Sequence, residues 1–451
     1  MQLDVLVKGG ILPDGLQRDI AIAGGKIVAI EPNIKALARE TVDAAGCLVS
    51  PPFVDAHFHM DATLSYGIPR INASGTLLEG ITLWGELKPL LTHEAVMERA
   101  LAYCDWAVSM GLLAIRSHVD ICDDRLLAVE ALLEVKKKVA SYLDLQLVAF
   151  PQDGFYRSQS AEANTLRALD LGVDVVGGIP HFERTMEEGR RSIRALCEIA
   201  AQRGLRVDLH CDETDDPLSR HIETLAAETL RLKLAGRVAG SHLTSMHSMD
   251  NYYVTKLLPL VAEAGVAAIP NPLINIVIQG RHDTYPKRRG MTRVPEMLNS
   301  GITVAFGQDC VLDPWYPLGT ADMLDVAFMG LHVAQMTSPA DMRRCFDLVT
   351  SACWNIFVAK LVRPILANKL HSYFDLNRLR GMRADPSKSS RSARRFPLGW
   401  KYTILGVFRW SAQNERPPEG NLAYLSRTKR VLFPSAQLGD CLSPDKYGSR
   451  Q

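Results

Sequence analysis

Two histidines stand two residues apart in a short apolar run that reads Val-Asp-Ala-His-Phe-His, at residues 54–59. Alternate side chains of a β-strand point to the same side, so His57 and His59 are expected to face one surface together. Two converging imidazoles form half of a metal site. A pair of this kind can also be a structural pair in a core, and the pair alone does not decide between the two.

Polar residues of the same kinds follow other apolar runs of the chain. His210 and Glu213 follow the fifth such run, His242 the sixth, and Asp309 the eighth. A buried carboxylate at Asp309 would be costly unless it were paired or liganded. This recurrence favours a metal site over a structural histidine pair.

The ligand set His57, His59, His210 and Asp309 offers three nitrogen atoms and one oxygen atom. Such a set suits one divalent ion of borderline softness, and it does not distinguish Zn²⁺ from Fe²⁺. The ion would lower the pKa of bound water to about 7, which generates hydroxide at neutral pH. The sequence therefore predicts hydrolytic chemistry.

The elements that must position these residues are short apolar runs separated by longer helix-like segments. Eight runs can be identified, at residues 53–54, 112–115, 145–150, 173–179, 205–209, 238–240, 266–269 and 302–306. Runs that are apolar throughout are typical of strands covered on both faces. We therefore expect an α/β fold, a (β/α)₈ TIM-type barrel over residues 51–345, with its site at the carboxyl ends of the strands. An open doubly wound sheet is the alternative, but no glycine-rich phosphate fingerprint follows the first run.

The two flanks of this region differ from it. Residues 1–50 contain short alternating runs at 5–7, 19–22 and 26–30 that are bounded by Gly and Pro, which predicts a small β-sandwich-like domain. Residues 346–451 become basic and lose periodicity, and we find no strand there that would return to the N-terminal sheet. This leaves a divergent, poorly ordered segment or a shifted reading frame as open interpretations, with an unpaired sheet edge as the consequence.

Composition limits the class of protein. Of 451 residues, 47% are hydrophobic and 22% charged, and the net charge is +1, which gives no reason to expect a nucleic-acid partner. The nine cysteines are scattered, which favours reduced thiols and a cytoplasmic location. The uncharged stretch 265–280 contains two prolines and is shorter than the roughly 18 apolar residues of a membrane span, so no membrane partner is expected.

Longer stretches resemble the bacterial cytosine deaminases of the amidohydrolase superfamily. The similarity covers roughly residues 1–345 and is carried by the His-x-His pair and by the stretches at 74–81, 148–152, 210–213, 271–273, 280–290 and 313–319. The resemblance implies a small nucleobase as substrate and assembly into a homo-oligomer. It also implies a hydrolase of C–N bonds in cyclic amidines.

The resemblance further implies roles for individual residues. His57, His59, His210 and Asp309 would bind one metal ion, and Asp309 would also take a proton from the attacking water. Glu213 would protonate the ring nitrogen, and His242 would orient the water. Gln152 and the carbonyl of Leu77 would bind the edge of the base, with Trp315 as a wall of the pocket. The part played by His118, after the second run, stays open.

Two absent patterns support this interpretation. The zinc-deaminase signature with His-x-Glu and Pro-Cys-x-x-Cys is missing. The fourth run, at 173–179, has no lysine of the kind that bridges two metals in other superfamily members. A single metal and deamination are therefore expected.

The sequence departs from the family beside Asp309. Cys310 stands where these deaminases usually carry a second aspartate, and Gln308 replaces a histidine. In these deaminases the second aspartate lies near the edge of the pyrimidine away from the attacked bond. Cysteine is smaller, uncharged and mildly apolar, so the resemblance implies that it opens space near ring carbon five. This predicts a preference for a 5-substituted cytosine such as 5-methylcytosine, unless the replacement is neutral. Deamination of another cyclic amidine, such as isoguanine or an aminotriazine, and an inactive metal-binding paralogue stay open as alternatives.

Overall fold

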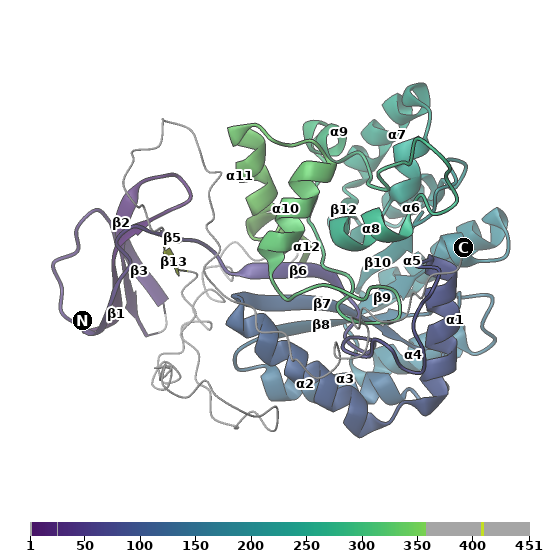
Figure 1. Cartoon of the computed structure of the whole chain (residues 1–451), viewed down its shortest axis with the longest axis horizontal. Coiled ribbons are helices and arrows are strands. Elements are labelled where there is room, and N and C mark those ends of the chain that lie inside the picture. The colour runs from purple at the N-terminus through teal and green to yellow at the C-terminus, as the bar shows by residue number, and fades with distance from the viewer. Residues whose placement is uncertain (1, 25, 358–406, 410–451) are drawn as a thin grey trace, which may run out of the picture.

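The computed structural model describes residues 2–24, 26–357 and 407–409. A small β-sheet near the N-terminus lies beside a larger unit of strands and helices (Figure 1). We expected the basic C-terminal segment to be divergent and poorly ordered, or to reflect a shifted reading frame. Most of this segment, residues 358–406 and 410–451, lies outside the described residues.

The larger unit is built on seven parallel strands, each paired with the next along the chain. They are β6 (Phe53–Phe58), β7 (Leu112–Asp120), β8 (Asp144–Phe150), β9 (Val175–Gly178), β10 (Arg206–Cys211), β11 (Val238–His242) and β12 (Ala267–Ile269).

The eighth run closes the barrel through isolated bridges. Ala268 pairs with Val304, and Phe58 pairs with Asp309. The amide of Ala305 donates to the carbonyl of Ala268 at 3.0 Å, and the amide of Asp309 donates to the carbonyl of His57 at 2.8 Å. The predicted TIM-type barrel is thus confirmed.

Helices cover the outside of the barrel and alternate with its strands. They are α1 (Leu77–Leu87), α2 (His93–Ser109), α3 (Leu127–Val139), α4 (Ala161–Leu171), α5 (Met186–Arg203), α6 (His221–Arg231), α7 (Asn251–Ala264), α8 (Pro272–Ile278), α9 (Val294–Asn299), α10 (Met323–Val333), α11 (Pro339–Asp347) and α12 (Ser351–Phe357). Local sequence sets their ends. In α5, the hydroxyl of Thr185 accepts from the amide of Glu188, and Gly204 ends the helix at φ +67°.

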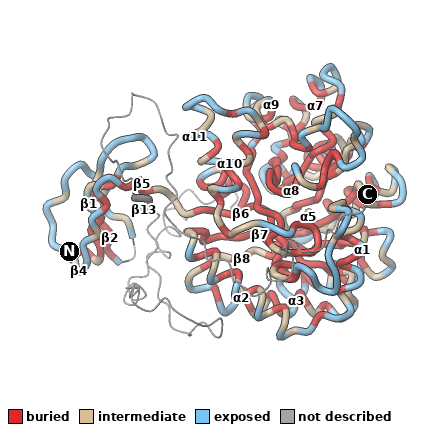
Figure 2. The backbone as a smooth tube through the Cα atoms, viewed as in Figure 1, coloured by how far each residue is buried: buried red, intermediate tan, exposed pale blue. Residues whose placement is uncertain are grey.

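The strands of the barrel are buried along almost their whole length, whereas the helices expose one face (Figure 2). Near the beginning of the strands the buried residues are small, including Ala114, Ala239 and Ala305. Trp354 and Phe357 of α12 pack against them. The aromatic side chains of α12 therefore fill the end of the barrel opposite the predicted metal ligands.

The N-terminal sheet contains β1 (Leu3–Ile11), β2 (Gln17–Ala23), β3 (Lys26–Glu31), β4 (Ala38–Asp43) and β5 (Cys47–Val49). We expected the first strand to stop at Gly9, but β1 runs through it. The pairing with β2 shifts between Val7 and Gly10, and Gly9 adopts φ +68°, which is how a glycine makes a β-bulge.

The expectation that no strand returns to this sheet is wrong for one short segment. β13 (Val407–Arg409) pairs antiparallel with β5. Three residues without a clear alternation are too short to be recognised as a strand from sequence. Among the described residues, no helix has the length and apolar character that a membrane crossing requires.

Candidate active site

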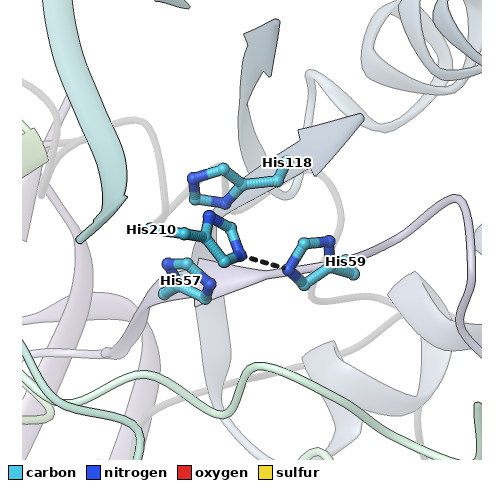
Figure 3. Close-up of side chains that lie close together, drawn as sticks. All are labelled: His57, His59, His118 and His210. Carbon is cyan, nitrogen blue, oxygen red and sulfur yellow. Dashed lines mark hydrogen bonds between the residues drawn. The ribbon is translucent and has the colours of Figure 1, made fainter. Parts of the chain in front are cut away.

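The predicted metal ligands meet at the carboxyl ends of the barrel strands. His57 lies near the end of β6, His59 directly after it, and His210 near the end of β10. Figure 3 shows these rings turned toward one another, together with His118 from β7. Asp309 reaches the same place from the closing run because its amide bonds to the carbonyl of His57. Strand ends that are remote in sequence thus supply one cluster.

The ligand atoms of this cluster face each other at short range. Nε2 of His59 lies 2.9 Å from Nε2 of His210, and Oδ1 of Asp309 lies 3.4 Å from Nε2 of both His57 and His59. Nε2 of His57 is buried without a hydrogen-bond partner. Imidazole nitrogens and a carboxylate oxygen that converge at this range suit a cation, so the residues fit a divalent metal ion.

Burial also keeps the imidazoles in the state that a metal requires. It lowers the pKa of His57, His59 and His210 well below the ordinary value, and His118 beside them lowers these pKa values further. At neutral pH the three rings are therefore unprotonated, and each can offer a lone pair.

His118 belongs to the same cluster, although the sequence left its part open. It is fully buried, its ring centroid lies 4.2 Å from that of His57, and neither ring nitrogen has a hydrogen-bond partner. Two overlapping groups of four could hold an ion, one formed by His57, His59, His118 and His210 and the other by His57, His210, His242 and Asp309. The predicted ligands are divided between these groups.

Glu213 and His242 stand next to the ligands. Oε1 of Glu213 lies 3.2 Å from Nδ1 of His242, and Nε2 of that ring lies 3.8 Å from Oδ2 of Asp309. The side-chain amide of Asn275 lies 3.0 Å from Nδ1 of His242, and that of Asn271 lies 3.2 Å from the same atom. These two asparagines hold the imidazole and were not assigned a role from sequence. For Asn271 the available signal was the Asn-Pro-Leu stretch at 271–273 that contributed to the resemblance.

The two carboxyl groups influence each other's charge. Burial raises the pKa of Glu213 well above its usual value, and the carboxylate of Asp309 raises it further. Burial likewise raises the pKa of Asp309, with a further contribution from Asp313. Without a cation, burial therefore shifts both carboxyl groups toward their protonated forms.

The backbone is strained where the site residues project. Asp212, His242 and Asp309 adopt φ values of +54°, +69° and +69°, in the left-handed region that side-chain-bearing residues rarely enter. Such conformations cost about 1–3 kcal/mol each and occur where function requires them. At the end of β10, the side chain of Asp212 turns to the start of α6, where it accepts hydrogen bonds from the amides of His221 and Ile222. At the ends of β11 and the closing run, the side chains of His242 and Asp309 face each other in the site.

Of the residues expected to contact the substrate, Trp315 lies next to this cluster. The ring of Trp315 lies 6.1 Å from that of His59. Trp315 packs so closely on α1 that a Cβ added at Gly80 would lie 2.2 Å from its Cδ1 atom. Leu77, one turn earlier, begins this helix. Gln152 is buried two residues after β8.

Cys310 is buried beside Asp309. Its Sγ atom lies 3.6 Å from Oδ1 of Asp309. Burial and the neighbouring carboxyl groups raise the pKa of the Cys310 thiol well above its usual value. The thiol is therefore neutral and adds a small, weakly polar surface next to the ligands.

Known proteins resemble this chain over most of its length. Residues 40–357 match the Amidohydrolase family. The structure of 5-methylcytosine deaminase from Klebsiella pneumoniae, liganded with 5-fluorocytosine, is similar with a TM-score of 0.76 and 40% identity, covering 78% of this chain and 86% of that one.

Two curated relatives are more distant in sequence. N-isopropylammelide isopropyl amidohydrolase of Pseudomonas sp. (strain ADP) is 27% identical, covering 74% of this chain and 80% of its own length. Pterin deaminase of Rhizobium rhizogenes is 27% identical, covering 73% and 75%. The resemblance noted from the motifs is thus confirmed: the chain belongs to the amidohydrolase family and is a hydrolase that acts on carbon–nitrogen bonds.

Proposed function

We propose that this protein is a metal-dependent deaminase of an aminopyrimidine base, with 5-methylcytosine preferred over cytosine. The observation that carries the proposal is the convergence of three neutral imidazoles and Asp309 beside the buried carboxyl group of Glu213. The similarity to a 5-methylcytosine deaminase supports the choice of base.

The ligands of one divalent ion, Zn²⁺ or Fe²⁺, would be His57, His59, His210 and Asp309. When bound there, the ion would supply a hydroxide nucleophile at neutral pH, because it lowers the pKa of water to about 7. His118 is a further candidate ligand, because both of its ring nitrogens are buried without hydrogen-bond partners and its ring centroid lies 4.2 Å from that of His57.

The chain's own residues bind the base and move protons. Gln152 and the carbonyl of Leu77 hold the edge of the ring, and Trp315 forms a wall. Asp309 accepts a proton from the attacking water, and His242 orients that water. Glu213 donates a proton to the ring nitrogen next to the amino-bearing carbon, so that this carbon accepts the nucleophile. The proton held by Asp309 passes to the amino group, which leaves as ammonia, and the hydroxyl proton passes to Glu213 as the carbonyl forms. Acid–base assistance of this kind contributes about 10² to 10⁴-fold.

Cys310 supports the preference for a 5-methyl group. A neutral thiol beside Asp309 leaves an uncharged wall, whereas an aspartate would add a further carboxyl group next to Asp309 and Asp313. A methyl group in an apolar pocket contributes about 1–3 kcal/mol, which corresponds to a tenfold to 200-fold preference.

The preference is tested with kcat/KM for 5-methylcytosine and cytosine in the natural enzyme, in Cys310→Asp and in Cys310→Ala. We expect Cys310→Asp to lower the ratio of the two values by at least tenfold. Cys310→Ala, which keeps the wall uncharged, should retain the ratio. An unchanged ratio in Cys310→Asp would remove the argument for 5-methylcytosine.

The wider choice of substrate is tested by ammonia release from a panel of bases with the metal-loaded enzyme. The relatives named for N-isopropylammelide and pterin favour including an aminotriazine, isoguanine and pterin as competitors. Turnover of pyrimidines above the other rings supports the proposal. Turnover restricted to the other heterocycles would replace the substrate, and no ammonia from any base would indicate a metal-binding protein without this activity.

A further inference from the structure

A chain of buried hydrogen bonds extends from the predicted metal ligand His57 into the barrel, and the sequence did not predict it. Nδ1 of His57 lies 2.8 Å from the hydroxyl oxygen of Ser241. That hydroxyl donates to Oδ1 of Asp208 at 2.7 Å, and Arg116 donates to Oδ2 of Asp208 at 2.9 Å. All four side chains are at most 1% exposed, so water does not compete for these bonds.

The direction of these bonds fixes the proton on His57. A carboxylate only accepts hydrogen bonds, so the proton of the Ser241 hydroxyl must point to Asp208. The lone pairs of that hydroxyl remain, and the contact with His57 is a hydrogen bond only if Nδ1 carries the proton. The neutral ring then has its lone pair on Nε2, which is the atom that faces Asp309 at 3.4 Å.

Arg116, at the far end of this chain of hydrogen bonds, is anchored at the opposite end of the barrel. Nη2 of Arg116 donates to the carbonyl of Ile356 in α12 at 2.9 Å, and its Nε donates to Oε1 of Gln146 at 2.7 Å. A guanidinium stays charged in proteins, so it favours an ionised Asp208 in spite of the burial. Asp208 therefore has a fixed partner on each of its two oxygens.

We propose that Ser241, Asp208 and Arg116 are positioning residues that hold His57 in the tautomer that binds metal. This chain of hydrogen bonds would set the affinity of the site for metal without contacting the substrate. Partners of this kind behind a metal-binding histidine typically change metal affinity by about 10- to 100-fold. The inference rests on the proposed metal site.

The experiment measures the dissociation constant for Zn²⁺ by competition with a chelator in the full-length wild type, Ser241→Ala and Asp208→Asn. We expect each variant to bind Zn²⁺ about 10- to 100-fold more weakly. Ser192→Ala is the matched control, because Ser192 is an equally buried serine whose hydroxyl donates to the carbonyl of Gly189 in α5, away from the site. Its dissociation constant should equal that of the wild type.

A second measurement separates positioning from loss of structure. Nitrogen-15 NMR of histidine-labelled, metal-free protein reports which ring nitrogen of His57 carries the proton, with His57→Gln used to assign the signal. The wild type should show the Nδ1–H form, and Ser241→Ala should show a mixture of tautomers. Unchanged Zn²⁺ affinity and an unchanged tautomer in Ser241→Ala would overturn the inference. A wild type that binds no Zn²⁺ would instead overturn the metal site of the proposed function, and the tautomer would still decide whether the chain orients His57.

Discussion

Glu213 shows how burial at the scale of one residue produces a reactive group. The side chain is almost shut off from water, and burial together with Asp309 raises its pKa well above the usual value. A carboxyl group that keeps its proton at neutral pH can act as a general acid. The substitution Glu213→Gln removes the transferable proton while preserving the shape of the side chain.

We expect Glu213→Gln to lower kcat by about 10²- to 10⁴-fold with little change in bound metal. In the wild type, kcat/KM should fall as the pH rises through the raised pKa, because the ionised form has no proton to donate. The measurement is a pH profile of both proteins with metal content determined in parallel. Activity of Glu213→Gln within a few-fold of the wild type would exclude Glu213 as the proton donor.

The ligand residues could be predicted because a single local rule locates them. His57 lies near the end of β6 and His59 directly after it, with the two-residue period of a β-strand. Asp309 follows the closing run, so barrel topology alone brings the three together. Asn275, which contacts His242, is different, because nothing near it in sequence identifies its partner. The contact between Ser241 and His57 joins residues 184 positions apart, and only the folded chain defines it.

At the scale of one element, α1 connects the outer wall of the barrel to the site. Its Trp84 donates a hydrogen bond to Asp120 at 2.8 Å, and the ring of Trp315 packs directly against the backbone of Gly80. A methyl group at position 80 would lie 2.2 Å from Trp315, well inside contact distance, so the indole must move. The close packing of α1 against Trp315 therefore depends on the glycine at position 80.

We expect Gly80→Ala to raise KM at least tenfold, since it displaces a wall of the proposed substrate pocket, and to leave the Zn²⁺ content unchanged. Gly85→Ala is a control in the same helix, because a Cβ there meets nothing within 4 Å. Alanine favours helix over glycine by about 1 kcal/mol, so Gly85→Ala should keep KM and gain slightly in stability. Equal KM values for the two variants would show that Trp315 does not border the bound base.

The elements of the barrel were predictable because continuous apolar runs mark strands that are covered on both faces. Even the closing run at 302–306 was recognised, although the structure joins it only through isolated bridges at Val304 and Asp309. Elements whose identity depends on a partner were missed. β1 continues through Gly9 because β2 accommodates a bulge there, and β13 is a strand only because it pairs with β5.

At the scale of the whole molecule, the barrel is filled from both ends by different kinds of residue. At one end α12 inserts Trp354 and Phe357 among alanines, so residues that pack on the barrel continue past residue 345, where we expected the catalytic region to end. At the other end the predicted metal ligands occupy the barrel instead of apolar side chains. Arg116 joins the two ends, because it donates to the carbonyl of Ile356 in α12 and to Asp208. Asp208 in turn is linked to His57 through Ser241.

A cation at the polar end would connect strands on opposite sides of the barrel, since His57 belongs to β6, His210 to β10 and Asp309 to the closing run. A ligand that binds only the folded state stabilises it by about 2.7 kcal/mol at a free concentration 100 times its Kd. Chelation should therefore lower the Tm of the wild type by several degrees, and added Zn²⁺ should restore it, in thermal scans at one fixed heating rate. His210→Ala supplies the control, because it lacks one ligand and its Tm should respond far less to Zn²⁺ or chelator. If the wild type and His210→Ala respond alike, the stabilising ion binds elsewhere and the barrel mouth is not its site.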